Sequence, residues 1–373
     1  MHYWCGVSAI AGALRRRVWV DMGYFRWFPN FYIILVAPPG VVSKSTTASI
    51  AMNLLRKVAG VNFGPETVTW QALVASFEAV TETYQVGEDH YTQSAITIES
   101  SELGNLVDPQ NREQIDMLVN LWDCKVGTFK KVTKGSGVNS VENPFINIVA
   151  CTTPAWIAGN FPEYVIGGGF TSRCLFVYAD EKEKYVAYPA RHMPKEMYEV
   201  QTALVQDLEQ ISSQLLGPYI LTEDAIKWGE EWYLSHWKNK PDELDDDRFS
   251  GYLARKQTAV HKTAMCIAAS ARNEMVITLE DLQDAVKAVS GLEKDMVKVF
   301  ARIGRTQTSV QAERFIRYVQ KKGSVPYADA YRFIHTAFPS AKNFEDIVAG
   351  AMKSGQIRAE QIVGGGINLI SMK

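Results

Sequence analysis

Residues 31–55, FYIILVAPPGVVSKSTTASIAMNLL, decide the fold of the chain. Seven apolar or aromatic residues in a row are typical of a buried strand, and the Pro-Pro-Gly turn that follows ends it. A Lys-Ser-Thr-Thr cluster then leads into an apolar helix. A helix N-terminus presents unpaired backbone N–H groups and the positive end of the helix dipole, so this strand, loop and helix are suited to holding phosphate groups.

The loop carries the residue types that phosphate binding needs. Lys44 would place a positive charge on the outer phosphates, and Ser45 or Thr46 would offer a hydroxyl to Mg²⁺. Pro39 and Gly40 form the turn that would bring the backbone against the phosphates. The strict pattern G-x-x-x-x-G-K-[ST] is not met, because an alanine stands in place of the first glycine and a valine and a serine precede the lysine. The alternative is an ordinary strand–loop–helix connection with a solvated lysine.

Composition places the chain among ordinary globular proteins. Its 373 residues favour about two domains, and 47% hydrophobic with 21% charged residues gives no sign of disorder. A net charge of −2 argues against a uniformly basic nucleic-acid-binding surface, but it allows local basic patches. The five cysteines are scattered without a C-x-x-C pair, and no apolar run is long enough to span a membrane. We therefore expect reduced, mostly buried thiols in a soluble cytoplasmic protein with no membrane partner.

A second polar cluster follows the apolar strand predicted over 95–98. Glu99, Ser100, Ser101 and Glu102 come directly after this strand. A nucleotide hydrolase needs a carboxylate at such a place to orient the attacking water and to organise Mg²⁺, and Glu102 is the residue we expect in this role. Ser101 replaces the acid usually expected on the metal side, so Glu99 or Asp123 would have to compensate. The alternative is a helix N-cap formed by Ser100 or Ser101.

A third set of polar residues surrounds the apolar strand INIVACTT, 146–153. Thr152 at its end, or Asn147 nearby, would sense a γ-phosphate, because strands of a parallel sheet end beside the ligand crevice. A β-hairpin is predicted before this strand, and lysines around its Lys-Gly-Ser-Gly tip suit contact with a DNA backbone. These lysines are Lys130, Lys131 and Lys134. The alternative is an ordinary solvated turn.

Two arginines are further candidates. Arg173 follows a Gly-Gly-Gly segment and begins the strand RCLFVYA. It would pair with a carboxylate of its own subunit, or reach the phosphates of a neighbouring subunit as an arginine finger. Arg255 lies on a helix rich in Ala, Met and Ile, where it would face the nucleotide or form a surface ion pair.

Around these motifs the apolar pattern predicts a mainly parallel α/β sheet of about five strands, followed by helices. Before the sheet, an opening helix and an entry strand are predicted within 1–30. The core, 31–181, has helices over 47–58, 69–82 and 110–123 and a polar loop at 88–90. A charged linker, 182–191, precedes helices over 196–215, 222–238, 250–272 and 278–303. The final segment, 311–373, has helices followed by a two-stranded hairpin, as in a winged helix.

The segments from VWVDMGYF through KSTTASIAMNLL, ITIESSELG and INIVACTTPAW to GGGFTSRCLFVYA resemble a family of phage and prophage P-loop proteins described as helicase- or primase-like. More distantly they resemble the hexameric superfamily 3 helicases and minichromosome-maintenance-type AAA+ ATPases. The resemblance covers roughly residues 17–305. It implies a P-loop NTPase core at 31–181 and a helical lid at 192–305, whereas the winged-helix-like domain at 311–373 is predicted from its own pattern of helices and a hairpin.

The resemblance also implies roles for the candidate residues. Lys44 would bind phosphate, Ser45 or Thr46 would bind Mg²⁺, Glu102 would be catalytic, and Thr152 or Asn147 would be the sensor. The resemblance makes Arg173 the arginine acting in trans, Arg255 a second sensor in the lid, and the lysine hairpin the DNA-contacting loop of a central channel. We therefore expect an oligomeric ATPase, a hexameric ring, that uses ATP and Mg²⁺ to act on single-stranded DNA during replication of a phage or mobile element. The alternatives are a weakly hydrolysing helicase loader or scaffold, and a DNA-binding replication initiator.

Overall fold

The computed structural model describes residues 1–66, 70–133, 137–241, 244–300, 307–335, 341–362 and 366–372. The chain divides into two compact units, Met1–Ala301 and Arg302–Lys373. Contacts within each unit far outnumber those between the two units, so the domain boundary lies near residue 301. None of the helices in these described ranges combines the length and the apolar composition that a membrane span requires.

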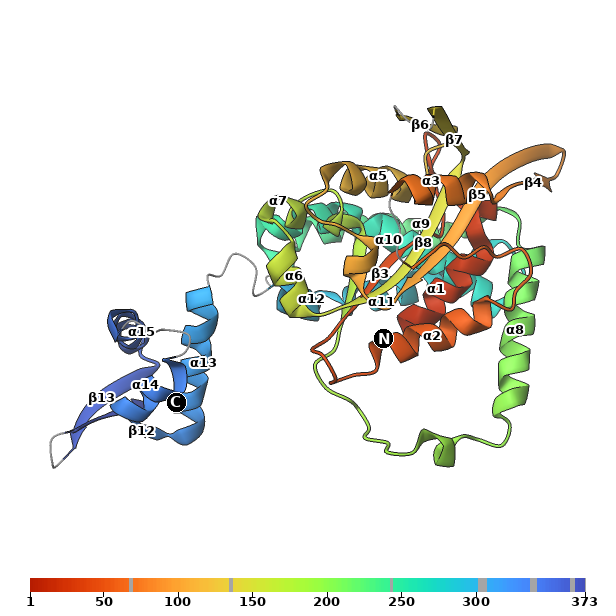
Figure 1. Ribbon diagram of the computed structural model, residues 1–373. Helices are drawn as coiled ribbons and strands as arrows, with labels where there is room; N and C mark the ends of the chain where they lie inside the picture. The colour runs from red at the N-terminus through yellow and green to blue at the C-terminus, as the bar shows by residue number, and fades with distance from the viewer. Residues whose placement is uncertain are drawn as a thin grey trace. The chain divides into compact units, whose positions relative to one another are not determined.

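The larger unit is built on a five-stranded sheet with the order β4-β5-β8-β3-β9 (Figure 1). Four of these strands are parallel and β4 is antiparallel, so the expected α/β architecture with a mainly parallel sheet is confirmed. The strands are β3 (Tyr32–Val36), β4 (Thr81–Val86), β5 (Asp89–Ser100), β8 (Pro144–Thr152) and β9 (Cys174–Tyr178). Every residue of β3 and β8 is buried, because helices cover both faces of the sheet.

Helices α1 (His2–Leu14) and α5 (Arg112–Trp122) lie on opposite faces of this sheet. Asn147 of β8 donates to the backbone oxygen of Ser8 in α1 at 2.9 Å, whereas the Tyr32 hydroxyl donates to the Leu118 oxygen in α5 at 2.7 Å. Tyr32 is paired in register with Ile148, the residue after Asn147. Successive side chains of a strand point to opposite faces, so the two helices must cover different faces. Helix α2 (Lys44–Leu55) packs beside α1.

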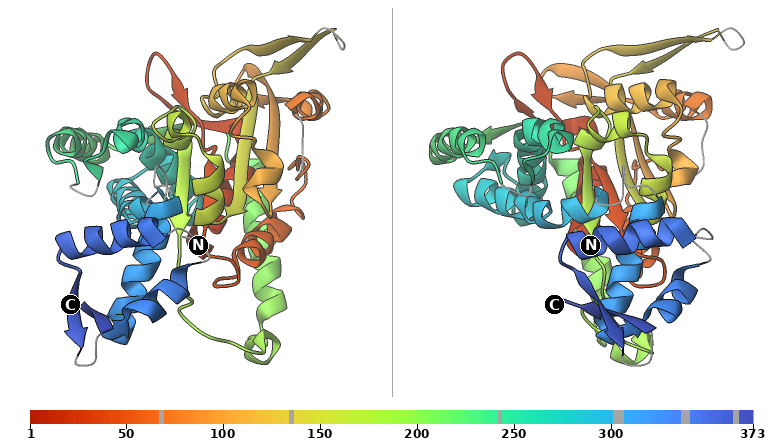
Figure 2. Two further views of the ribbon diagram at one scale, coloured as in Figure 1. Left: turned by 60° about the vertical axis from the view of Figure 1, so that its left-hand side comes forward. Right: turned by 90° about the vertical axis from the view of Figure 1, so that its left-hand side faces the viewer.

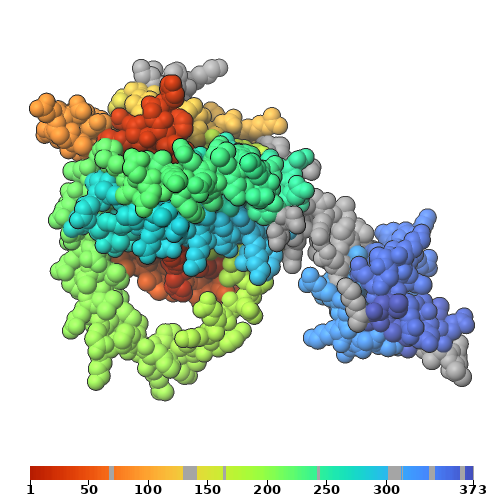
Figure 3. Space-filling model, turned by 180° about the vertical axis from the view of Figure 1, so that it is seen from behind, coloured from red at the N-terminus to blue at the C-terminus, as the bar shows by residue number. Residues whose placement is uncertain are grey.

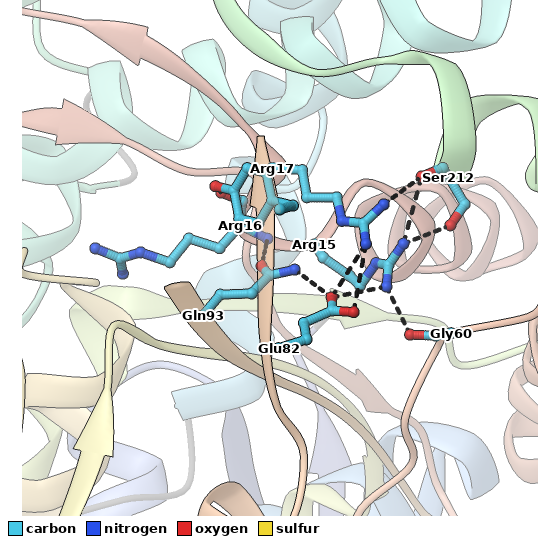
Figure 4. Close-up of polar contacts among 8 residues, drawn as sticks. Arg15, Arg16, Arg17, Gly60, Glu82, Gln93 and Ser212 are labelled. Atoms are coloured by element: carbon cyan, nitrogen blue, oxygen red, sulfur yellow. Dashed lines mark hydrogen bonds and ion pairs between the residues drawn. The ribbon is translucent and has the colours of Figure 1, made fainter. Parts of the chain in front are cut away.

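Three consecutive arginines after α1 hydrogen-bond to several distant segments of the larger unit (Figure 4). Arg15 donates to Glu82 of β4 at 2.9 Å, to the Gly60 oxygen at 2.6 Å and to the Ser212 hydroxyl at 2.8 Å. Arg17 shares the Glu82 carboxylate, and the Arg16 backbone N–H donates to the Gln93 side chain at 2.9 Å. The arginines therefore fix α1 against the edge hairpin β4–β5 and against α8 (Met197–Gln214).

The sequence prediction for the edge hairpin was wrong. The helix expected over 69–82 ends at Glu78 as α3 (Trp70–Glu78), and the expected polar loop at 88–90 belongs to a hairpin with Gly87 in the turn at φ 62°. Residues 81–86, TETYQV, alternate between exposed and half-buried, which is the pattern of an edge strand. Their pairing with β5 outweighs the local helix signal.

A second, smaller sheet has the order β11-β10-β1-β2. Its strands are β1 (Val18–Asp21), β2 (Arg26–Trp27), β10 (Gly217–Leu221) and β11 (Val276–Ile277). The entry strand β1 thus pairs in parallel with β10, from the region expected to be almost wholly helical. The strand β10 has only five residues, and both of its partners, β1 and β11, lie far from it in the sequence, so it leaves little local signal.

The remaining helices of the larger unit include two that match the prediction, three short ones that were not predicted, and two that take the place of one expected helix. They are α4 (Leu103–Leu106), α6 (Pro154–Asn160), α7 (Glu163–Ile166), α9 (Glu223–Lys238), α10 (Asp247–Ala271), α11 (Leu279–Ser290) and α12 (Glu293–Phe300). The single helix expected over 278–303 is divided at Gly291 and Leu292 into α11 and α12. The charged segment before α8 is exposed over residues 183–196, and Figure 3 shows it standing off the body of the unit.

The hairpin expected before β8 is confirmed as β6 (Thr128–Thr133) and β7 (Gly137–Glu142). It projects from the body of the unit in both views of Figure 2. Because β7 leads directly into Pro144 at the start of β8, the hairpin lies at the edge of the sheet where the parallel strands begin.

The smaller unit confirms the expected helices followed by a hairpin and adds a short third strand. Its elements are α13 (Gln307–Lys322), β12 (Ser324–Pro326), α14 (Tyr327–Ile334), α15 (Ala341–Lys353), β13 (Ile357–Ile362) and β14 (Gly366–Ser371), and the strand order is β12-β14-β13. Phe315, Val319, Phe344 and Leu369 are each at most 1% exposed, so this unit has a core of its own.

All five cysteines are free and buried, as predicted.

Candidate functional site

The candidate phosphate loop connects the end of β3 to the start of α2. The Ala37 N–H donates to the Thr152 oxygen at 3.3 Å, which holds the start of the loop beside the end of β8. Gly40 has a φ of 71°, a left-handed conformation that side chains disfavour, and this explains the glycine in the turn. Helix α2 begins at Lys44, three residues earlier than predicted, so the Lys-Ser-Thr-Thr cluster forms its first turn.

Lys44 folds back over this loop. Its ammonium group donates to the Ala37 carbonyl oxygen at 3.0 Å, and no carboxylate of the described residues forms an ion pair with it. Partial burial lowers the pKa of Lys44, whereas the nearby Cys151 and Glu102 act in the opposite direction. The lysine is therefore a cation held inside the loop without a counter-ion, close enough to Glu102 to be affected by its charge.

Ser45 and Thr46 are exposed in the first turn of α2. Their backbone N–H groups have no hydrogen-bond partner in the described parts of the chain, as expected for the first residues of a helix. Two hydroxyls, two free N–H groups and one ammonium group thus meet at one end of α2.

Glu102 is exposed just beyond the end of β5. The Ser100 hydroxyl donates to the Glu102 backbone oxygen at 2.8 Å, which fixes the turn after the strand. Glu102 itself occupies the N-cap position of the short helix α4, but its side chain makes no capping bond. The serine cap considered as an alternative is absent from this helix, and the Glu102 carboxylate remains available.

Neither acid considered as a substitute for Ser101 is free to bind a metal. Glu99 accepts from the Ser49 hydroxyl at 2.5 Å and from Arg56 at 2.9 Å, so it fastens β5 to α2. Asp123 is engaged with Arg173, as described below. Among the described residues, no group of three or more His, Cys, Asp or Glu side chains is placed to hold a metal ion.

The two sensor candidates lie at different ends of β8. Thr152 is paired with Val36 at the end of the strand, beside the loop. Asn147 is fully buried and donates to Ser8, and its side-chain oxygen accepts from the Phe31 N–H at 3.3 Å. Five residues of strand separate the two positions, or roughly 16 Å. The expectation that Asn147 contacts a phosphate is therefore wrong, because it joins the sheet to α1.

Arg173 and Arg255 lie at the edge of the sheet opposite the phosphate loop. Arg173 precedes Cys174, which pairs with Tyr32 at the start of β3, whereas the loop follows the end of β3. Arg173 donates to both oxygens of Asp123, at 2.8 and 2.9 Å, so of the two alternatives for this arginine the structure has the pair within one chain. Burial lowers the pKa of Arg255, and the neighbouring Arg173 lowers it further. Arg255 thus does not face the phosphate loop of its own chain.

The hairpin lysines also belong to the opposite edge. Lys130 and Lys131 lie in β6, paired with Ser140 and Asn139 of β7. Lys134 lies outside the described residues. The structure therefore brings together Lys44, Ser45, Thr46, Glu102 and Thr152 beside the turn Pro39–Gly40, and it separates from them Asn147, Arg173, Arg255 and the hairpin.

Two residues at the opposite edge were not singled out from the sequence. Lys262 was visible only as one of several cations on an apolar helix, and Trp122 only as an apolar position of α5. Lys262 is 2% exposed, donates to the Asn30 side-chain oxygen at 2.6 Å and lies 3.7 Å from the centre of a Trp122 ring.

No protein-family model matches the chain, and no curated protein matches it either.

Proposed function

We propose that the larger unit is an ATPase of the P-loop class and that the whole chain is an oligomeric DNA motor of the replicative-helicase kind. The observation that carries this proposal is the meeting of Lys44, the first turn of α2 and Glu102 at the edge where the parallel strands end. In open α/β sheets, ligands bind outside the carboxyl ends of the strands. A helix N-terminus with a lysine suits a triphosphate, and an adjacent carboxylate suits the hydrolytic water.

The residues fit a nucleoside triphosphate with Mg²⁺. Among the described residues, the Ser45 and Thr46 N–H groups have no partner, and the Lys44 ammonium group is bonded only to the loop's own Ala37 oxygen. Magnesium ATP, when bound, supplies the phosphoanhydride bond and the cation that polarises it. Lys44 would exchange the Ala37 oxygen for phosphate oxygens, the Ser45 or Thr46 hydroxyl would bind Mg²⁺, and Glu102 would orient water and accept its proton. Thr152 would hydrogen-bond the outer phosphate.

The motor part of the proposal rests on the opposite edge of the sheet. Because Arg173 lies roughly 20 Å of strand away from the loop, it cannot serve the site of its own chain. A ring of subunits, a hexamer in the resemblance, would present this edge to the nucleotide of the neighbour, provided that Arg173 releases Asp123. The hairpin at the same edge would contact single-stranded DNA, and the smaller unit, as a winged helix, would add a second contact. In a phage-encoded protein this would take place in the host cytoplasm.

The first test is ATP hydrolysis with and without single-stranded DNA. We expect Glu102→Gln to lower the turnover rate by about 10²- to 10⁴-fold, the contribution of a positioned general base. Lys44→Ala is expected to abolish turnover, and Lys57→Ala, an exposed lysine beyond the end of the same helix, is the matched control. Hydrolysis that is absent from the wild type, or unchanged in both site variants, contradicts the proposal.

A second candidate function is a nucleotide-binding loader or scaffold that hydrolyses ATP weakly. The observation that favours it is the metal side of the site, where Ser101 replaces an acid and both Glu99 and Asp123 are engaged elsewhere. Tight binding of ATP without turnover would support this function. A third candidate, an initiator that binds DNA through the smaller unit, requires that deletion of residues 302–373 removes most DNA affinity.

A further inference from the structure

A cavity of about 350 Å³ lies at the edge of the sheet opposite the phosphate loop. It is lined by residues of the β1–β2 hairpin, the end of α5 and the middle of α10, among them Phe25, Trp27, Trp122, Lys125, Arg255 and Lys262. Its volume is at the lower end of the range of small-ligand sites. Of the residues that line this cavity, the proposed ATPase function uses only Arg173, together with its partner Asp123.

Positive charge in the cavity exceeds the negative charge that faces it. Arg173, Arg255 and Lys262 share the single carboxylate of Asp123, which is already bonded to Arg173 on both oxygens. Arg173 is more than nine-tenths buried, so water screens its charge poorly. Burial lowers the pKa of Lys262 to about 7, so an anion beside it would favour the charged form of this lysine. Lys125 adds an exposed cation at the rim. An anion in the cavity would relieve this repulsion.

The Trp122 indole provides an independent indication of a ligand. Trp122 is 7% exposed, and its Nε1–H is buried without a hydrogen-bond partner in the described parts of the chain. A buried donor without an acceptor is unfavourable by about 1–3 kcal/mol, and such groups in native proteins call for an explanation. An oxygen of a bound phosphate group would provide the acceptor.

Aromatic side chains extend from the cavity to the surface. Phe25 is 53% exposed and its ring centre lies 5.6 Å from that of Trp27, and the neighbouring Tyr24 is fully exposed at the tip of the β1–β2 turn. Exposed aromatic rings beside a cationic groove are the usual means of binding single strands, because bases stack on the rings while phosphates meet the cations. Phe25 and Tyr24 offer stacking surfaces for more than one base, which favours an oligonucleotide over a mononucleotide.

We propose that this cavity and the β1–β2 turn form a binding site for single-stranded nucleic acid, with a phosphate group near Arg255, Lys262 and the Trp122 N–H and bases stacked on Phe25 and Tyr24. The proposal deepens the proposed function, since it rests on the chain's acting on single strands, but it uses none of the residues of the phosphate loop. It also assigns DNA contact to a surface distinct from the β6–β7 hairpin.

The test is the affinity of the full chain for a fluorescently labelled oligothymidylate, measured by anisotropy without ATP over a series of salt concentrations. We expect Phe25→Ala to weaken binding by about 5- to 150-fold, the effect of losing one base–aromatic stack. Lys125→Gln is expected to reduce the slope of log affinity against log salt by about 0.7, the value for one phosphate of a single strand. Tyr198→Ala and Lys57→Gln, exposed residues elsewhere on the unit, should bind like the wild type.

Three results separate this site from the other proposals. Lys44→Ala should bind the oligonucleotide normally, so failure of the ATP site leaves this readout unchanged. Wild-type affinity in both Phe25→Ala and Lys125→Gln, with loss of affinity in the double variant Lys130→Gln, Lys131→Gln, would overturn the proposal in favour of the hairpin. Competition by thymidine monophosphate as strong as that by unlabelled oligothymidylate would overturn it in favour of a mononucleotide. Because Phe25 and Lys125 are exposed, both variants should fold.

Discussion

Helix α1 packs closely against α2 and β5 at Gly12, and this contact yields a stability prediction. A Cβ atom at this position would lie 2.5 Å from Leu55 Cδ2 and 2.8 Å from Thr97 Oγ1. Leu55 and Thr97 are at most 2% exposed, so neither can move into solvent. Gly6, in the same helix, has nothing within 4 Å of such an atom. The two glycines therefore form a matched pair.

Replacement of either glycine by alanine gains about 0.8–1 kcal/mol of helix propensity. Only Gly12→Ala adds atoms to a filled space, which typically destabilises by about 1–3 kcal/mol. Because the propensity gain is common to both variants, the difference between them reports the packing cost. We expect Gly6→Ala to be more stable than the wild type and Gly12→Ala to be less stable than Gly6→Ala by about 1–3 kcal/mol.

Urea unfolding followed by tryptophan fluorescence is the appropriate assay, because all nine tryptophans lie in residues 1–301 and report only on the larger unit. The free energies are compared at equal m-values, so that a change in the unfolded state is not mistaken for a packing effect. Equal stability of the two variants would refute the close packing of α1 on α2 and β5 described above.

Three further predictions concern Lys262, the cysteines and the smaller unit. Burial lowers the pKa of Lys262 from 10.5 to about 7, so above pH 7 the unfolded chain binds more protons than the folded one and the stability of the wild type rises with pH. The variant Lys262→Met should lack this rise, so its free energy of unfolding relative to the wild type should be lower by roughly 2 kcal/mol more at pH 9 than at pH 7. An equal difference between the two proteins in urea unfolding at both pH values would contradict this prediction. Burial raises the pKa of Cys5 to about 11 and that of Cys151 to about 12, and it also raises the pKa of the other three thiols. Ellman's reagent at pH 8 should therefore react with none of the five thiols in the native protein and with all five in urea. The fragment 302–373 should fold alone, with a cooperative thermal transition by circular dichroism, because Phe315, Phe344 and Leu369 form its own core; a featureless melt would disprove this.

Local pattern was sufficient for the elements that carry the phosphate loop. The run Phe31–Ala37 is apolar without alternation, and it contains β3, which has a neighbouring strand on each side. The start of α2 was predicted three residues late, because serine and threonine weaken the helix signal in its first turn. The hairpin before β8 was also clear, because its strands flank a glycine-rich tip.

The errors arise where partners are distant in the sequence. Asn147 is 139 residues from Ser8 in the sequence, and no neighbouring residue indicates that its side-chain amide hydrogen-bonds to α1. Arg173 and Asp123 are 50 residues apart, so the sequence left their pairing as one of two alternatives. The placement of Arg255 depends on the packing of α10 against the segment before β9, which no local pattern encodes. The sequence therefore predicted the partners of these polar residues less well than it predicted the apolar strands and helices.

The most direct test of the central claim is the binding of a non-hydrolysable ATP analogue with Mg²⁺, measured by isothermal titration calorimetry. We predict saturable binding by the wild type and by Lys57→Ala, retention of binding by Glu102→Gln, and its loss in Lys44→Ala. Binding that survives in Lys44→Ala, or that is absent from the wild type, would show that the loop between β3 and α2 is not a nucleotide site.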